Sequence, residues 1–227
     1  MVEISKKYKM GVRRFGLINW IGFWTLYKKE VLRFLIVWVQ TLLSPIISSL
    51  LFLLVLSVAI GSGRSDMLGF PFITFLAPGL IAMQIIQQAF SHSSSSFMIG
   101  KIQGNIVDIL YAPLSAGEVT LAVTLAAITR SFMIGVVSIC IFYFLVDIEI
   151  RNFYALIFYT FVSSFILGLV GIMAGLWAEK FDHMASVTNF LIIPLSFLSG
   201  TFYTIDNLPQ FLQVISKCNP FFYMIDG

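Results

Sequence analysis

Residues 34–63 read FLIVWVQTLLSPIISSLLFLLVLSVAIGSG and contain no Asp, Glu, Lys or Arg. A helix needs about 20 apolar residues to cross the hydrocarbon of a bilayer, where it satisfies its backbone hydrogen bonds internally. The stretch is long enough for one such crossing. Other charge-free intervals of comparable length follow at residues 67–100, 152–178 and 183–205. The sequence therefore predicts an all-α polytopic membrane protein.

The composition of the chain supports the same fold class. Of the 227 residues, 59% are hydrophobic and 11% are charged. Soluble globular domains carry about 25% charged residues, because their surfaces must be hydrated. A chain with so few charges offers no soluble domain that could present its basic N-terminus to DNA or RNA. We therefore expect no nucleic-acid partner.

Five transmembrane helices are expected within a single domain that spans residues 1–227. Their approximate limits are residues 34–60, 72–95, 119–146, 152–178 and 184–200. Eight of the fourteen Lys and Arg residues lie at or before Arg33, and positive charge gathers on the cytoplasmic side of membrane proteins. We therefore place the tail 1–18 and the loop 101–118 in the cytoplasm, and the segment 201–227 on the outer side of the cytoplasmic (inner) membrane.

An amphipathic helix is expected before the first crossing, at residues 19–33. Its apolar side chains recur at spacings of three and four residues: Trp20, Phe23, Trp24, Tyr27 and Val31. Beside them, charged residues form a mainly basic face: Lys28, Lys29, Glu30 and Arg33. This pattern is typical of a helix that lies in the membrane interface, with aromatic rings at headgroup depth and cations toward anionic lipid. The alternative is that the segment simply extends the first crossing.

The loop at residues 101–118 is predicted to contain a short amphipathic helix of its own. Asn105 can cap this helix, and Pro113 ends it. We expect Ile106, Ile109 and Leu110 to share one face. A helix stranded between two crossings must bury its apolar face on lipid headgroups or on a cytoplasmic partner. Contact with a cytoplasmic partner would give the loop a role in transmitting force from that partner.

The third crossing contains one cation, Arg130. A cation near the middle of a span costs about 2.5 to 3.5 kcal/mol on insertion scales, unless pairing, water or snorkelling offsets it. Either a structural contact within the protein or a contact with a substrate would explain the presence of Arg130. Prolines within the spans, Pro45, Pro78 and Pro194, interrupt the helical hydrogen bonds and predict bends.

Motifs for nucleotide hydrolysis and acyl transfer are missing from the sequence, which has no GxxxxGK[ST] loop and no GxSxG turn. The two histidines, His92 and His183, are far apart, and His92 has no neighbouring carboxylate or thiol. We therefore expect no catalytic residue, no metal site and no cofactor in this chain. An enzyme acting on lipid carriers would require paired carboxylates or a metal cluster near one face, and no such set is visible.

Two segments carry a more specific pattern. The loop has a Gly, an acidic residue, a Leu and then Pro-x-Ser, at Gly104, Asp108, Leu110, Pro113 and Ser115. The C-terminal part reads PLSFLSGTFY at residues 194–203, followed by Leu208-Pro209, Asn219-Pro220 and Tyr223. Together these segments resemble the permeases of the ABC-2 type, the membrane-spanning subunits of ATP-binding cassette exporters. The similarity extends over nearly the whole chain.

The resemblance implies six membrane helices per subunit, with re-entrant helices on the outer side after the fifth. We call the matching residues of the C-terminal part the outer signature: Pro194, Gly200, Phe202, Pro209, Asn219 and Pro220. Gly200 and the breaks at Pro209 and Pro220 fit re-entrant helices. The chain ends at Gly227, before a sixth crossing, so we expect a truncated form of this unit. The loop also departs from the family pattern, because the usual basic and acidic pair before Gly104 is reduced to Lys101 and Gln103.

The expected function is export of an apolar or amphipathic substrate, such as a drug, a lipid or a lipid-linked glycan. A separate ATPase subunit would bind ATP and Mg²⁺, and two copies of the permease would pair to enclose the path. The residues expected to engage the ATPase are Gly104, Asn105, Ile106, Asp108, Ile109, Leu110 and Pro113. The alternative is a secondary transporter or channel without a motor, in which Arg130 and the bent spans form the substrate site.

Overall fold

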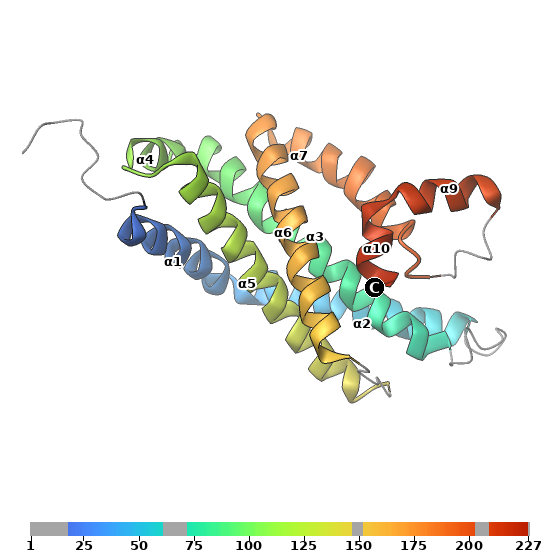
Figure 1. The fold of residues 1–227 in the computed structure, drawn as a ribbon. Coiled ribbons are helices and arrows are strands. Elements are labelled where there is room, and N and C mark those ends of the chain that lie inside the picture. The colour runs from blue at the N-terminus through green and yellow to red at the C-terminus, as the bar shows by residue number, and fades with distance from the viewer. Residues whose placement is uncertain (1–17, 61–71, 147–151, 203–208, 227) are drawn as a thin grey trace, which may run out of the picture.

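The computed structural model describes residues 18–60, 72–146, 152–202 and 209–226 (Figure 1). Within these ranges every regular element is helical, which confirms the predicted all-α fold. The α-helices are α1 (Trp20–Ile36), α2 (Ser44–Ile60), α3 (Phe72–Ile102), α4 (Ile106–Tyr111), α5 (Ala116–Tyr143), α6 (Phe153–Trp177), α7 (Phe181–Val187), α8 (Ile193–Phe197), α9 (Gln210–Cys218) and α10 (Pro220–Asp226). Two π-helical turns, η1 (Val39–Leu43) and η2 (Thr188–Ile192), lie between them.

Four helical segments among the described residues are long and apolar enough to cross a membrane. They are Val39–Ala59, Phe72–Ile102, Ala116–Tyr143 and Phe153–Trp177, and they coincide with the first four predicted crossings. The fifth predicted crossing, at residues 184–200, falls on the shorter consecutive elements α7, η2 and α8. It is not among the four candidates and stays a prediction.

Two of the predicted proline bends coincide with π-helical turns. The turn η1 ends two residues before Pro45, and η2 ends two residues before Pro194. A proline has no backbone N–H, and its ring crowds the carbonyl group four residues earlier, so a wider turn at this place accommodates the break. Pro78 instead lies inside α3.

The core of the bundle is built around α3, against which α5 and α6 pack (Figure 1). Ser93 and Ser94, in the serine run of α3, are fully or almost fully buried. A Cβ atom added to Gly171 of α6 would lie 2.6 Å from the carbonyl oxygen of Phe90, and one added to Gly175 would lie 2.7 Å from that of Ser94. The small side chains of both helices therefore permit the close approach of their backbones.

The C-terminal ends of α3 and α6 meet at one end of the bundle. Lys101, near the C-terminal end of α3, donates through Nζ to the carbonyl oxygen of Leu176 and, at 3.0 Å, to that of Ala178. It thereby satisfies carbonyl groups at the C-terminus of α6, where a cation is favourable. This contact places the C-terminal ends of α3 and α6 on the same side of the bundle. The assignment of that side to the cytoplasm stays a prediction.

Candidate functional site

The start of α1 is attached to the loop between α4 and α5. Oδ1 of Asn19 accepts a hydrogen bond from the backbone N–H of Gly22 at 3.0 Å and so caps α1. Nδ2 of Asn19 donates to the carbonyl oxygen of Pro113 at 3.2 Å, and its backbone N–H donates to Oε1 of Glu118 at 2.6 Å. Because Asn19 is buried, these contacts are shielded from solvent and fix α1 to the loop.

Glu118 also caps the helix in which it lies. Its backbone N–H donates to Oγ of Ser115 at 3.3 Å, and its Oε2 accepts a hydrogen bond from the backbone N–H of Ser115 at 2.6 Å. This reciprocal arrangement is a capping box at the start of α5. Since Oε1 of the same carboxylate binds Asn19, one side chain joins the starts of α1 and α5. Sequence analysis missed this role, although the Ser-x-x-Glu spacing is a known helix-start signal.

The short helix predicted in the loop is present as α4. It follows Gly104, whose φ of 76° is a backbone conformation that favours glycine. Asn105 occupies the cap position, but its side chain makes no cap hydrogen bond, and its Nδ2 donates to Oε1 of Gln103 at 3.2 Å instead. The predicted capping by the Asn105 side chain is therefore wrong. Asp108 is exposed in the first turn of α4, where the helix dipole favours a negative charge.

The apolar residues of α4 are divided between two faces. Ile106 and Ile109 are half-buried. Ile106 packs against the cluster of Phe97, Val123 and Ile172, and Ile109 packs against the cluster of Phe23, Leu26 and Ala122. Leu110 is 76% exposed. The prediction that these three residues form one face turned toward lipid or a partner is therefore wrong for Ile106 and Ile109, which pack into the bundle, whereas Leu110 is exposed.

The outer side of α4 carries three apolar or aromatic side chains, Val107, Leu110 and Tyr111, which we call the α4 face. Their spacing of three and four residues places them on one side of the helix. Tyr111 is 87% exposed, and Val107 is also exposed. The opposite side of α4, with Ile106 and Ile109, is packed against the bundle, so the α4 face is presented outward on a supported helix.

The interfacial character predicted for α1 fits only part of the helix. Trp20, Trp24, Lys28 and Lys29 are exposed, as such a helix requires. Glu30, in contrast, is 2% exposed, and Arg33 is turned toward α3. The prediction that Arg33 belongs to a lipid-facing basic face is therefore wrong, because its guanidinium group contacts Glu30 and the carbonyl oxygen of His92 on α3.

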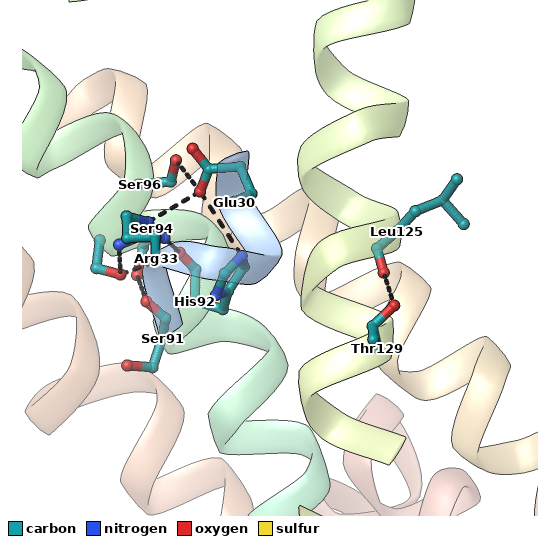
Figure 2. Close-up of polar contacts among 9 residues, drawn as sticks. Glu30, Arg33, Ser91, His92, Ser94, Ser96, Leu125 and Thr129 are labelled. Carbon is teal, nitrogen blue, oxygen red and sulfur yellow. Dashed lines mark hydrogen bonds and ion pairs between the residues drawn. The ribbon is translucent and has the colours of Figure 1, made fainter. Parts of the chain in front are cut away.

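Glu30 and Arg33 belong to a polar cluster with the serine run of α3, which we call the Glu30 cluster (Figure 2). Nε of Arg33 lies 3.0 Å from Oε2 of Glu30. Oγ of Ser96 donates to the same carboxylate oxygen at 2.8 Å, and Nη2 of Arg33 donates to the carbonyl oxygen of His92 at 3.2 Å. Nε2 of His92 lies 3.8 Å from Oε2 of Glu30. The cluster therefore ties α1 to α3.

Arg130 of α5 is buried, with 7% of its surface exposed. One nitrogen, Nη2, donates to Oε1 of Gln88 on α3, whereas Nε has no hydrogen-bond partner among the described residues. One of the two alternatives, a structural contact, is therefore present, and it leaves Nε of the guanidinium group without a partner among the described residues.

A groove of about 960 Å³ lies between the α1–α2 segment and α3. Its polar lining includes two arginines and three glutamines of α3: Arg33, Arg130, Gln84, Gln87 and Gln88. The glutamines are spaced by three and four residues and so follow one face of α3. Sequence analysis did not single them out, although amides at helical spacing in an apolar span are a signal that can be read directly.

The residues of the predicted outer signature lie at helix starts and turns. Pro194, Pro209 and Pro220 each lie at or next to the start of a helix, and Gly200 has a φ of 84°. Nδ2 of Asn219 donates to the carbonyl oxygen of Leu195 at 2.7 Å, which joins the start of α10 to α8. The ring of Phe202 stacks on Phe197 with a centroid distance of 5.3 Å.

The comparisons of this chain with known proteins agree on one family. A family model described as ABC-2 type transporter matches residues 21–227. The chain is 33% identical over 210 residues to the inner membrane transport permease YadH of Escherichia coli strain K12, covering 92% of this chain and 82% of that protein. It is 26% identical over 222 residues to nodulation protein J of Rhizobium leguminosarum bv. trifolii, covering 93% and 80%. The chain therefore belongs to the ABC-2 type transporter family, as its loop and C-terminal segments predicted.

Proposed function

We propose that the chain is the membrane-spanning subunit of an ATP-driven exporter and that a separate ATPase docks on the α4 face. Family membership supports the transport function. The observation that supports docking is the exposure of Val107, Leu110 and Tyr111 on a helix whose other side is packed. An apolar helix face of this kind fits a groove on a partner protein.

The contacts around α4 offer a route for movement from the ATPase into the membrane helices. A displacement of α4 reaches α5 through the short connection that ends in the capping box of Ser115 and Glu118. It reaches α1 through the hydrogen bonds of Asn19 to Pro113 and Glu118. An ATPase whose open and closed states contact α4 differently would therefore shift the equilibrium between two arrangements of these helices.

The proposal also covers the orientation of the chain, its partners and its substrate. The loop that carries α4 and the N-terminal tail lie in the cytoplasm, and the ATPase supplies the sites for ATP and Mg²⁺. Two copies of the chain pair in the cytoplasmic membrane and enclose a path for an apolar or amphipathic substrate. The exposed Trp20, Trp24, Lys28 and Lys29 of α1 contact lipid headgroups.

The substitution Leu110→Asp tests the docking role. The side chain is 76% exposed, so the change should leave the fold and membrane insertion intact. A charge in an apolar contact should lower ATP-dependent export and the stimulation of ATPase activity by the permease at least about tenfold. The matched control is Phe211→Asp on α9, a position 73% exposed, which should leave both activities unchanged. Normal export by the Leu110→Asp variant would count against docking at α4.

Purification of the complex distinguishes the exporter from a transporter without a motor. An exporter subunit should co-purify with an ATPase whose turnover depends on the permease. Transport that proceeds in vesicles containing the permease alone, driven by an ion gradient and without ATP, would establish the other class.

A further inference from the structure

The groove between the α1–α2 segment and α3 carries a positive charge. Arg33 and Arg130 both line it, and no Asp or Glu occurs among the described residues of its lining. Arg33 is already paired with Glu30 at 3.0 Å, outside the lining. The guanidinium group of Arg130 contacts the neutral amide of Gln88, so its charge is not compensated there.

Two side chains that line the groove each carry a buried nitrogen donor without a partner among the described residues, Nε of Arg130 and Nε2 of Gln84. Each side chain is 7% exposed, so neither nitrogen is satisfied by bulk solvent. Oε1 of Gln84 accepts a hydrogen bond from Oγ of Ser138 at 3.3 Å, which orients the amide. Buried donors without acceptors are costly, and an anion with several oxygen atoms would satisfy them.

The same groove has an apolar end. Phe52, Phe197 and Phe202 line it together with Leu80. The ring of Phe202 lies 5.6 Å from that of Phe52 and 5.3 Å from that of Phe197. Gln84 and Gln88 follow Leu80 by four and eight residues on α3, which corresponds to about 6 and 12 Å along the helix. Polar and aromatic walls are therefore separated along the length of the groove.

We propose that this groove binds an amphipathic anion. Its phosphate, sulfate or carboxylate head accepts hydrogen bonds from Arg130 and Gln84. Its apolar part lies against Phe52, Phe197 and Phe202. As the transported substrate, this ligand would narrow the substrate class of the proposed exporter to amphipathic anions. Only the statement that the ligand is the transported substrate rests on the proposed function.

Binding is measured on the full permease chain in nanodiscs of phosphatidylcholine, without ATPase and without nucleotide. The probes share one tail and differ in the head: dodecyl phosphate, dodecyltrimethylammonium and dodecyl maltoside. Titration calorimetry, with empty nanodiscs as the blank, should show dodecyl phosphate binding about tenfold or more tightly than the other two. Inorganic phosphate alone should bind more weakly than dodecyl phosphate, because it has no apolar part.

Two substitutions connect the binding to the groove. Arg130→Gln should weaken dodecyl phosphate binding about tenfold, whereas Arg130→Lys should retain most of it. Gln84→Glu keeps the size of the side chain and adds a negative charge, so it should also weaken binding and provides the test if Arg130→Gln does not fold. The matched control is Lys217→Gln on α9, which removes an exposed cation outside the groove and should change nothing.

Several results would overturn the proposal. Equal affinity for the three head groups would contradict an anion site, and so would unchanged binding in both Arg130→Gln and Gln84→Glu. Equal affinity for inorganic phosphate and dodecyl phosphate would contradict the apolar part. The absence of binding by any probe, expected if a second copy of the chain fills the groove, would exclude a ligand site. None of these results affects the docking test at Leu110, which is read from ATPase activity.

Discussion

Glu30 and Arg33 lie one helical turn apart on α1 and form an ion pair in which Nε and Oε2 are 3.0 Å apart. The Glu30 side chain is 2% exposed and that of Arg33 is 28% exposed. The pair is completed by Ser96 and the carbonyl oxygen of His92, both on α3. A helix that the sequence places in the membrane interface is therefore fastened to the centre of the bundle by buried polar contacts.

Removal of the Glu30 charge should loosen α1. The substitution Glu30→Gln leaves Arg33 without its anionic partner and should reduce stability by about 1–3 kcal/mol, since Arg33 retains some access to solvent. The measurement is the thermal unfolding temperature of the purified permease in detergent. Lys29→Gln, an exposed position on the same helix, is the control and should have little effect. Equal unfolding temperatures for the wild type and Glu30→Gln would show that the cluster does not stabilise the fold.

Asn19→Ala should detach the start of α1 from the loop before α5. The variant loses the cap hydrogen bond to Gly22 and the hydrogen bond to Pro113. The loss of a cap costs about 1 kcal/mol, which corresponds to about fivefold less protection of the first amides of α1 from hydrogen exchange. Thr25→Ala, which removes only a local and exposed hydrogen bond to Ile21, should leave that protection unchanged. Full protection in Asn19→Ala would argue against this attachment.

A methyl group at Gly171 should force α3 and α6 apart. The added Cβ would lie 2.6 Å from the backbone oxygen of Phe90, which has no side-chain freedom to move away. We expect Gly171→Ala to lower stability by about 1–3 kcal/mol in thermal unfolding. Gly117→Ala is the matched control, because nothing lies within 4 Å of its added Cβ. That variant should be unchanged or more stable by up to about 1 kcal/mol.

The four candidate membrane helices could be predicted from the sequence because the signal for each, a long apolar segment, is local. Each of the four candidate spans is a long apolar segment that can be recognised without knowing its neighbours. The capping box of Ser115 and Glu118 is also a local signal, because the two residues are three positions apart in the sequence. The hydrogen bond from Asn19 to Glu118 has no local signal, because it joins residues 99 positions apart.

The errors of the sequence analysis have a common physical origin. Apolar residues occur on both sides of α1 and of α4, so periodicity alone does not show which side is packed. Ile106 and Ile109 were assigned, with Leu110, to a face turned toward lipid or a partner, although both isoleucines pack against the bundle. Arg33 was assigned to the lipid-facing basic face together with Lys28 and Lys29, whereas its guanidinium group donates to the carbonyl oxygen of His92 on α3.

The central claim is that a cytoplasmic ATPase contacts the α4 face, and photo-crosslinking tests it most directly. A photoreactive phenylalanine analogue is placed at Tyr111, which is 87% exposed, and for comparison at Phe211 on α9. Irradiation of native membranes should join Tyr111 to a soluble subunit that binds ATP, whereas Phe211 should give no such product. Crosslinks from Tyr111 only to lipid, or labelling of Tyr111 by an impermeant reagent added outside the cell, would contradict the claim.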